Sequence, residues 1–365
     1  MGVEVLTGDC RQLLNAMPPA SVQCCVTSPP YFGLRDYGVA GQIGLEPSPD
    51  EYVAEMVAVF RKVHRVLRDD GTLWLNLGDS YSMRHVGRRD HGTGNPTSRL
   101  GPKMDGLPGG TEIKAGSNRL VSGYKPKDLL MIPARVALAL QADGWWLRSD
   151  IIWQKLNPMP ESVNDRPTCA HEHVFLLTKQ AKYFYDADAI REPMAASSIS
   201  RLAQDITKQG GSHRANGGAK TNGPMKAVGR TDKQRGHSRR HAGFNDRWDA
   251  MEKSGQRANG ANARNVWTIA AAPYSEAHFA TFPPALAERC IKAGTHAGDT
   301  VLDPFGGAGT TGLVADRLQR DAILIELNPQ YVSLARKRIA ADKGPITALM
   351  ENGPTSGSPI QKALF

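Results

Sequence analysis

Short apolar runs alternate along the chain with amphipathic segments whose apolar residues recur at helical spacing. Six apolar runs are expected to form strands, at residues 22–27, 72–77, 148–153, 173–178, 300–303 and 322–327. Amphipathic segments that neighbour them are expected to form helices, at residues 128–142, 284–293, 311–318 and 329–341. Because strands and helices alternate, the pattern predicts an α/β fold with a mostly parallel sheet and helices on both faces.

The clearest helix is expected after Ser48. Ser48-Pro49-Asp50-Glu51 combines a capping box with proline at the first helical position. One face of the segment that follows is apolar, through Val53, Met56, Val57, Phe60, Val63 and Leu67. We expect this helix to end near Asp70-Gly71.

Two segments lack periodic apolar positions. Residues 83–123 contain nine glycines and seven basic residues. Residues 193–265 contain 14 Lys and Arg against five Asp and Glu, a surplus equal to the +9 of the whole 365-residue chain. Clustered Lys and Arg bind phosphate backbones by releasing counterions, so we expect a basic insertion at residues 191–265 that contacts nucleic acid. Its candidate contact residues are Arg230, Arg235, Arg239 and Arg240. Two solvated insertions without a partner remain the alternative.

The overall composition excludes several classes of protein. With 40% apolar and 22% charged residues the chain has the composition of a globular protein, and no stretch approaches the roughly 20 apolar residues that span a bilayer. Residues 1–9 lack the basic and apolar blocks of a secretory signal. The five cysteines form an odd set without Cys-x-x-Cys spacing, which predicts neither disulfides nor a zinc site. We therefore expect a cytoplasmic protein with reduced thiols and no bound metal.

A glycine-rich turn follows the strand expected at residues 300–303. The segment 303–312 reads Asp-Pro-Phe-Gly-Gly-Ala-Gly-Thr-Thr-Gly, and residues 307–312 match G-x-G-x-x-G. Such a turn lets a ligand approach the backbone and points free helix N–H groups at it. Glu326, at the end of the next strand, is placed to accept hydrogen bonds from ribose hydroxyls. The pattern predicts a nucleoside-cofactor site, with a purely structural turn as the alternative.

A pair of prolines follows the strand expected at residues 22–27. Ser28-Pro29-Pro30-Tyr31 lies where open α/β sheets bind ligands, at the carboxyl end of a strand. The peptide that joins the prolines presents a carbonyl acceptor without a neighbouring N–H donor, and the Ser28 hydroxyl is a second acceptor. Two acceptors can hold both hydrogens of an aromatic amine and free its lone pair, while Tyr31 stacks on the base. A rigid turn with a packed tyrosine remains the alternative.

Taken together, these two motifs resemble those of the DNA amino-methyltransferases, which use S-adenosylmethionine and carry a T-S-P-P-Y or D-P-P-Y loop and a D-P-F-x-G-[ST]-G-T turn. The loop comes first and the turn last, as in the beta group of that family, a permuted order of the methyltransferase fold. The resemblance covers roughly residues 1–190 and 265–342, with further matching stretches at 6–10, 70–76, 152–158 and 278–283. It implies a Rossmann-like sheet with basic insertions.

The resemblance also implies roles for individual residues. Ser28, Pro29, Pro30 and Tyr31 would hold the target base. The methionine end of the cofactor would be surrounded by Asp303, Phe305, Gly307, Gly309 and Thr310, with Thr281 and Phe282 closing over it. Asp9 and Cys10 would lie near its adenine and Glu326 would bind its ribose. Ala308 stands where the family has Ser or Thr, which removes one hydroxyl contact to the cofactor.

Methylation of cytosine carbon 5 needs a thiolate nucleophile, and the chain has no Pro-Cys dipeptide. Cys24 and Cys25 lie within an apolar strand run, which favours structural thiols. We therefore expect direct transfer from S-adenosylmethionine to an exocyclic nitrogen after the base flips out of double-stranded DNA. In the resembled family Ser28 is associated with cytosine N4 and aspartate with adenine N6. Adenine N6 remains the alternative.

Lys155 and Asn157 are candidates for the pocket edge or for a phosphate contact. Two rivals outside this reaction class stay open at this point: a nicotinamide-dependent oxidoreductase that uses the G-x-G-x-x-G match, and a nucleic-acid binder without catalysis. The resemblance is compatible with a cognate restriction endonuclease and with a homodimer.

The expected organisation has four parts. They are a catalytic half at 1–190 with an insertion at 83–123, the basic insertion at 191–265, the cofactor-binding half of the same domain at 266–342, and a flexible tail at 343–365.

Overall fold

The computed structural model describes residues 2–82, 121, 123–194, 260–272 and 282–342. The chain divides into two compact units, residues 1–186 with 264–365 and residues 187–263. Within the second unit, Glu192 and Ala261 form an antiparallel bridge with two N–H···O bonds of 2.8 Å. The predicted domain boundaries stay a prediction, and most of the two insertions and the tail lies outside the described residues.

One eight-stranded sheet organises the first unit, in the order β1-β8-β7-β2-β3-β5-β4-β6. Its strands are β1 (Val3–Thr7), β2 (Val22–Thr27), β3 (Leu67–Leu77), β4 (Trp146–Lys155), β5 (His171–Thr178), β6 (Val266–Ile269), β7 (Thr300–Asp303) and β8 (Asp321–Glu326). Within this sheet only β5 runs antiparallel to its neighbours, β3 and β4. All other neighbouring pairs are parallel, which confirms the predicted mostly parallel α/β sheet.

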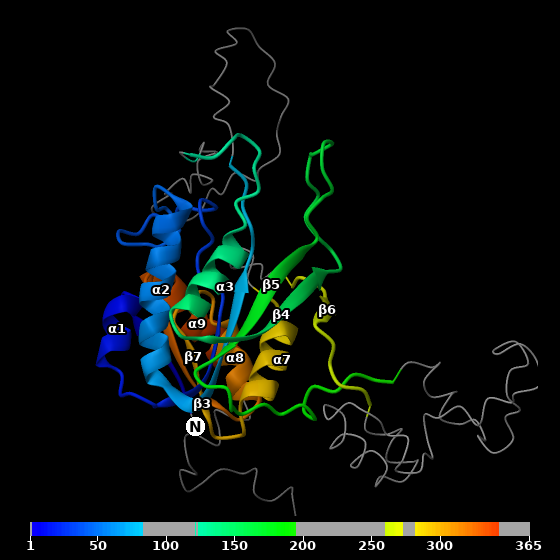
Figure 1. Cartoon of the computed structure of the whole chain (residues 1–365). Coiled ribbons are helices and arrows are strands. Elements are labelled where there is room, and N and C mark those ends of the chain that lie inside the picture. Colours follow the sequence, from blue (N-terminus) through cyan, green and yellow to red (C-terminus); the bar gives the residue numbers. More distant parts are fainter. Residues whose placement is uncertain (1, 83–120, 122, 195–259, 273–281, 343–365) are drawn as a thin grey trace, which may run out of the picture. The chain divides into compact units, whose positions relative to one another are not determined.

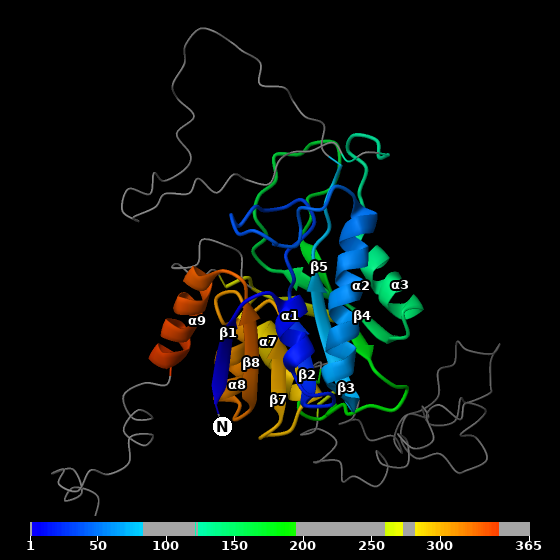
Figure 2. The ribbon, with the colours of Figure 1, turned by 90° about the vertical axis from the view of Figure 1, so that its left-hand side faces the viewer.

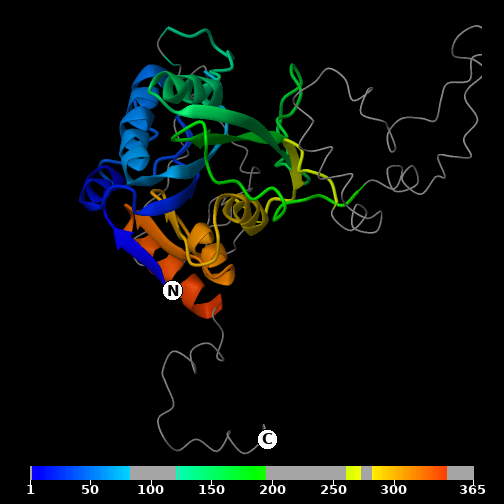
Figure 3. The ribbon, with the colours of Figure 1, turned by 60° about the horizontal axis from the view of Figure 1, so that its bottom comes forward.

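Helices cover both faces of this sheet. They are α1 (Cys10–Ala16), α2 (Pro49–Val66), α3 (Ile132–Ala142), α7 (Pro284–Gly294), α8 (Thr310–Arg317) and α9 (Pro329–Asp342). Figures 1 and 3 show α1, α2 and α3 together on one face and α7, α8 and α9 on the other. No helix within the described ranges is both long and apolar enough to cross a bilayer.

Residues from the two ends of the chain meet in the middle of the sheet. β2 pairs on one side with β3 and on the other with β7, and β1 pairs with β8. Figure 2 shows β1, β8, β7 and β2 side by side. Because these strands are parallel, the segments that follow β2 and β7 leave the sheet at the same edge.

Two predicted helix boundaries are wrong. Helix α2 is capped as predicted, with the Ser48 hydroxyl accepting from the Glu51 N–H at 3.3 Å, but it ends at Val66 instead of near Asp70-Gly71. The chain enters β3 directly because Leu67 pairs with Val22 of β2. Helix α3 begins at Ile132 instead of Asp128, since the preceding segment bonds to the loop after β3, through Ser80 and Ser82, and Met131 adopts a left-handed backbone.

Candidate active site

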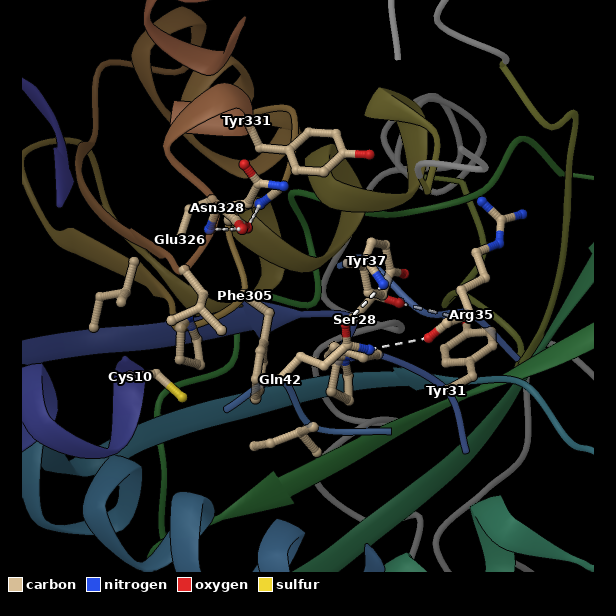
Figure 4. A pocket seen from close by; sticks show the side chains of 18 of the residues that line it. Cys10, Ser28, Tyr31, Arg35, Tyr37, Gln42, Phe305, Glu326, Asn328 and Tyr331 are labelled. Atoms are coloured by element: carbon tan, nitrogen blue, oxygen red, sulfur yellow. Dashed lines mark hydrogen bonds between the residues drawn. The ribbon is translucent and has the colours of Figure 1, made fainter. Parts of the chain in front are cut away.

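A cavity of about 360 Å³ opens at the carboxyl ends of β1, β8, β7, β2 and β3. Its lining comes from both ends of the chain: Gly8–Arg11 after β1, Ser28–Tyr31 after β2, Pro304–Ala308 after β7, and Glu326 at the end of β8. Its volume lies in the range of small-molecule sites. Figure 4 shows Ser28 and Tyr31 on one side and Phe305, Glu326 and Tyr331 on the other. The two motifs therefore share one cavity.

The diproline loop is held rigidly at one side of this cavity. The buried Tyr52 of α2 donates its hydroxyl to the Pro30 carbonyl oxygen at 2.9 Å. No donor among the described residues reaches the Pro29 carbonyl oxygen. A Cβ added at Gly78 would lie 2.6 Å from Cε2 of Tyr31, so the absence of a side chain at Gly78 makes room for the tyrosine ring.

A chain of polar side chains lies behind the Ser28 hydroxyl. Ser28 Oγ donates to Tyr31 Oη at 3.4 Å, and Tyr31 Oη donates to Glu172 Oε2 at 2.6 Å. Asn76 Nδ2 lies within 3.3 Å of Ser28 Oγ, Tyr31 Oη and Glu172 Oε2. Lys155 forms an ion pair with the other Glu172 oxygen. Burial, and next the charge of Glu172, raises the pKa of Tyr31 well above its usual value, so its hydroxyl keeps its proton.

The direction of these hydrogen bonds makes the Ser28 hydroxyl a better acceptor. Its hydroxyl proton points along the chain toward Tyr31 and ultimately toward the Glu172 carboxylate, which Lys155 neutralises. A hydroxyl whose proton is engaged in this way offers its lone pairs to other donors, and the polarisation of successive bonds strengthens it as an acceptor. Ser28 Oγ can therefore accept a hydrogen bond from an N–H group.

Asp303 fastens the glycine turn to the rest of the sheet. Its Oδ1 accepts from the Thr27 hydroxyl at 2.6 Å and from the Phe305 N–H at 3.1 Å, and its Oδ2 accepts from the Thr311 hydroxyl at 2.6 Å. Complete burial raises the pKa of this carboxyl to about 6. Asp303 and Gly309 are not among the residues that line the cavity. Asp303 instead fixes the position of Phe305, which does line it.

Glu326 stands at the opposite end of the turn. Its Oε2 accepts from the Gly307 N–H and its Oε1 from the Asn328 N–H, both at 2.8 Å. Burial raises the pKa of Glu326. Gly307 itself has a left-handed backbone, with φ of +50°. The carboxylate faces the cavity while the two N–H groups hold it, an arrangement suited to binding vicinal hydroxyls.

The first turn of α8 packs closely against α9. Gly309 has φ of +80°, and a Cβ there would lie 2.9 Å from that of Ala335. Arg338 donates to the Ala308 carbonyl oxygen at 3.1 Å and to the Thr310 hydroxyl at 3.0 Å. Ala308 and Thr310 both line the cavity. The Thr310 hydroxyl is therefore present beside the position where Ala308 lacks one.

Asp9 and Cys10 reach the cavity as the sequence predicted. Asp9 caps α1 by accepting from the Arg11 N–H at 2.8 Å, and its side chain pairs with the Arg11 guanidinium at 2.6 Å. This hydrogen bond lowers the pKa of Asp9. Arg11 also bonds to Glu55 and to the Gly41 carbonyl oxygen, which ties the loop after the diproline motif to α1. Burial keeps Cys10 a neutral thiol, with a pKa raised to about 12.

Several cavity residues were not singled out from the sequence. Glu172 and Asn76 complete the polar chain behind Ser28, and Arg11 braces Asp9. Tyr37 and Tyr331 face each other edge to face across the cofactor side, with ring centroids 6.5 Å apart. Two sequence signals pointed to Asn76: it interrupts an otherwise apolar strand run, and it ends the stretch 70–76 that matches the resembled family.

The predicted nucleic-acid contacts have different outcomes. Lys155 lines the cavity, but its ammonium is paired with Glu172. Asn157 accepts from the Ala271 N–H at 2.8 Å and donates to the Ala271 carbonyl oxygen at 3.2 Å, so it braces a cavity-lining residue. Phe282, which was predicted to close over the cofactor, lines the cavity as well. The other four predicted nucleic-acid contacts, Arg230, Arg235, Arg239 and Arg240, lie outside the described residues, as does Thr281, which was predicted to contact the cofactor.

Cys24 and Cys25 are fully buried in β2. Burial raises the pKa of Cys24 to about 12 and that of Cys25 well above its usual value. Neither thiol lines the cavity, so neither supplies the thiolate that methylation at cytosine carbon 5 requires. In the part of the chain that the structure describes, no three His, Cys, Asp or Glu side chains gather closely enough to hold a metal ion.

Comparisons with known proteins agree with this geometry. Residues 22–337 match a family model described as DNA methylase. The type II methyltransferase M.XycI of Xanthomonas campestris pv. cyanopsidis is 42% identical over 93% of this chain and 88% of its own length. M.Cfr9I of Citrobacter freundii is 40% identical over 93% of this chain and 89% of its own, and M.SmaI of Serratia marcescens is 40% identical over 92% and 90%.

Two solved structures share the fold. The PvuII DNA methyltransferase, described as cytosine-N4-specific, superposes with a TM-score of 0.55 at 18% identity, covering 95% of this chain and 93% of its own. The DNA modification methylase TTHA0409 of Thermus thermophilus, in complex with S-adenosyl-L-methionine, superposes with a TM-score of 0.51 at 22% identity, covering 94% and 97%.

Proposed function

Because the chain belongs to the DNA methylase family, and so methylates an exocyclic amine of cytosine or adenine with S-adenosylmethionine, we propose that its target is the N4 amine of cytosine in double-stranded DNA. Its relatives are type II methyltransferases, the enzymes of restriction-modification systems. A nicotinamide oxidoreductase and a binder without catalysis, the two rivals from the sequence, do not agree with this membership. A cognate endonuclease and a homodimer remain predictions.

The observation that carries the proposal is the pair of acceptors on one wall of the cavity. Ser28 Oγ has its own proton engaged by Tyr31, and the Pro29 carbonyl oxygen has no donor among the described residues. Together they accept both hydrogens of an exocyclic amine and draw its lone pair out of the ring. The amine nitrogen then becomes the nucleophile. No general base is required before transfer, because the methylated nitrogen is acidic enough to lose its proton afterwards.

The opposite wall fits the cofactor, which supplies an electrophilic methyl group when bound. Glu326 is held by two backbone N–H groups with its carboxylate toward the cavity, as a ribose-binding acid requires. Phe305, Gly307 and Thr310 line the same wall, and Asp303 holds the turn from behind. These residues position the methyl donor against the amine, and positioning supplies most of the acceleration in a direct displacement.

Cytosine is favoured over adenine by the acceptor itself. Ser28 is a neutral hydroxyl, and the Glu172 charge behind it is balanced by Lys155. In the resembled family a serine at this position is associated with cytosine N4 and an aspartate with adenine N6. The PvuII methyltransferase, which shares this fold, is described as cytosine-N4-specific.

Analysis of the methylated nucleosides tests the proposal. The purified protein is incubated with unmethylated genomic DNA and S-adenosylmethionine carrying a labelled methyl group, and the DNA is digested to nucleosides for mass spectrometry. We expect the label in N4-methyl-2′-deoxycytidine. Label in N6-methyl-2′-deoxyadenosine would move the target to adenine, and label at carbon 5 of cytosine would contradict the mechanism.

A further inference from the structure

The connection between β4 and β5 carries two apolar side chains that are left in water. Met159 is 85% exposed and Leu156 is 64% exposed, more than any other large apolar side chain among the described residues. Single exposed apolar residues are common, but these two lie three positions apart on one loop beside a functional cavity. Packing within the described part of the fold does not explain them.

This loop starts at the rim of the cavity. Lys155, the last residue of β4, lines the cavity immediately before Leu156. Asn157 is tied by two hydrogen bonds to the backbone of Ala271, which also lines the cavity. Figure 1 shows the green connection between β4 and β5 projecting beyond the ends of both strands. Met159 therefore stands on a projection whose base is part of the cavity wall.

The projection is braced at several points. The Arg166 guanidinium lies 4.1 Å from the centroid of the Tyr81 ring and pairs with Glu161 at 2.7 Å. Lys127 forms an ion pair with Asp165. Met159 itself stands between Pro158 and Pro160, which restrict the backbone on both sides of it. These contacts and the two prolines restrain the backbone of the loop on both sides of Met159.

A flipped base leaves a gap in the stack of the duplex, and DNA-binding proteins fill such gaps with apolar wedges inserted between base steps. We propose that Met159, assisted by Leu156, is the wedge that enters the duplex where the target nucleotide leaves it. A methionine suits this task because its unbranched side chain adapts to an irregular space. The inference rests on the proposed function, which requires the target amine to leave the helix.

The test compares two duplexes that contain the site methylated by the enzyme. In one the target cytosine is paired with guanine, and in the other it lies opposite an abasic position, where no pair has to be broken. The variant Met159→Ala with Leu156→Ala is expected to lose about tenfold in kcat/KM on the paired duplex and less than about twofold on the abasic one. Leu138→Ala, at a leucine that is 61% exposed on α3 and does not line the cavity, is the matched control and should change neither value.

An equal loss on both duplexes, or no loss on either, would overturn the wedge and leave the proposed function intact. If the unaltered protein transfers no methyl group to cytosine N4 in either duplex, the proposed function fails, and the wedge fails with it. Both altered side chains are exposed, so unfolding temperatures of the variant and the control should match that of the unaltered protein.

Discussion

Ser28→Ala is expected to lower kcat for DNA methylation by about 10²- to 10³-fold, the usual loss when one preorganised polar contact to the reacting group is removed. The variant removes the acceptor for one amine hydrogen and leaves the Pro29 carbonyl alone. Ser28 does not contact the glycine turn, so the Kd for S-adenosylmethionine should change by less than about twofold. Isothermal titration with the cofactor and initial rates of methyl incorporation measure the two effects separately.

Tyr31→Ala should behave in the same way, because the change removes both the ring that stacks on the base and the hydroxyl that engages the Ser28 proton. Ser333→Ala is a suitable control, since Ser333 lies on α9, is exposed, and bonds to the Pro329 carbonyl oxygen within its own helix. An equal loss of cofactor affinity in Ser28→Ala and Tyr31→Ala would contradict the assignment of both residues to the base.

Deletion of residues 195–258 is expected to weaken DNA binding by about 100-fold or more, because each lost phosphate contact removes released counterions from the binding equilibrium. These residues carry 13 of the 45 Lys and Arg of the chain. The design uses the bridge between Glu192 and Ala261, where two 2.8 Å hydrogen bonds bring the ends of the deletion together. Four residues, Pro193, Met194, Asn259 and Gly260, then connect the two bridge partners, a length that hairpin loops commonly have.

The salt dependence of DNA binding should become less steep in this deletion, and the Kd for S-adenosylmethionine should stay unchanged. Removing residues 343–365 is the matched control, since that segment contains only two Lys and one Glu. Fluorescence anisotropy with a labelled duplex at several salt concentrations gives both quantities. Unchanged DNA affinity in the 195–258 deletion would refute a recognition role for the basic insertion.

Four of the six strands that were found from the sequence, β2, β3, β5 and β7, are buried along most of their length. All six residues of β2 are buried, and four of them, the two valines and the two cysteines, are apolar. The strands β1 and β6 were missed because they lie at the two edges of the sheet and are only four or five residues long, with partly exposed patterns. Short edge strands gain their structure from the neighbour they pair with, and that pairing is invisible in a local pattern.

In the candidate site too, residues with a local sequence signal were identified, and residues whose role depends on the pairing of distant strands were missed. Ser28, Pro29 and Gly307 were recognised because prolines and glycines impose a backbone shape that the local sequence displays. Glu172 was missed because its role depends on β3 and β5 pairing, which brings a residue 141 positions from Tyr31 to its hydroxyl. Asp303 was assigned to the cofactor, and only the structure gives it Thr27 and Thr311 as partners.

The structure of a ternary complex with a non-reactive analogue of S-adenosylmethionine and a duplex containing the target site tests the proposed methyl transfer most directly. We expect a cytosine turned out of the helix, with its amino nitrogen about 3 Å from both Ser28 Oγ and the Pro29 carbonyl oxygen, and facing the methyl position of the analogue. A cytosine amine bound by other acceptors, or separated from the methyl position by a protein wall, would contradict it.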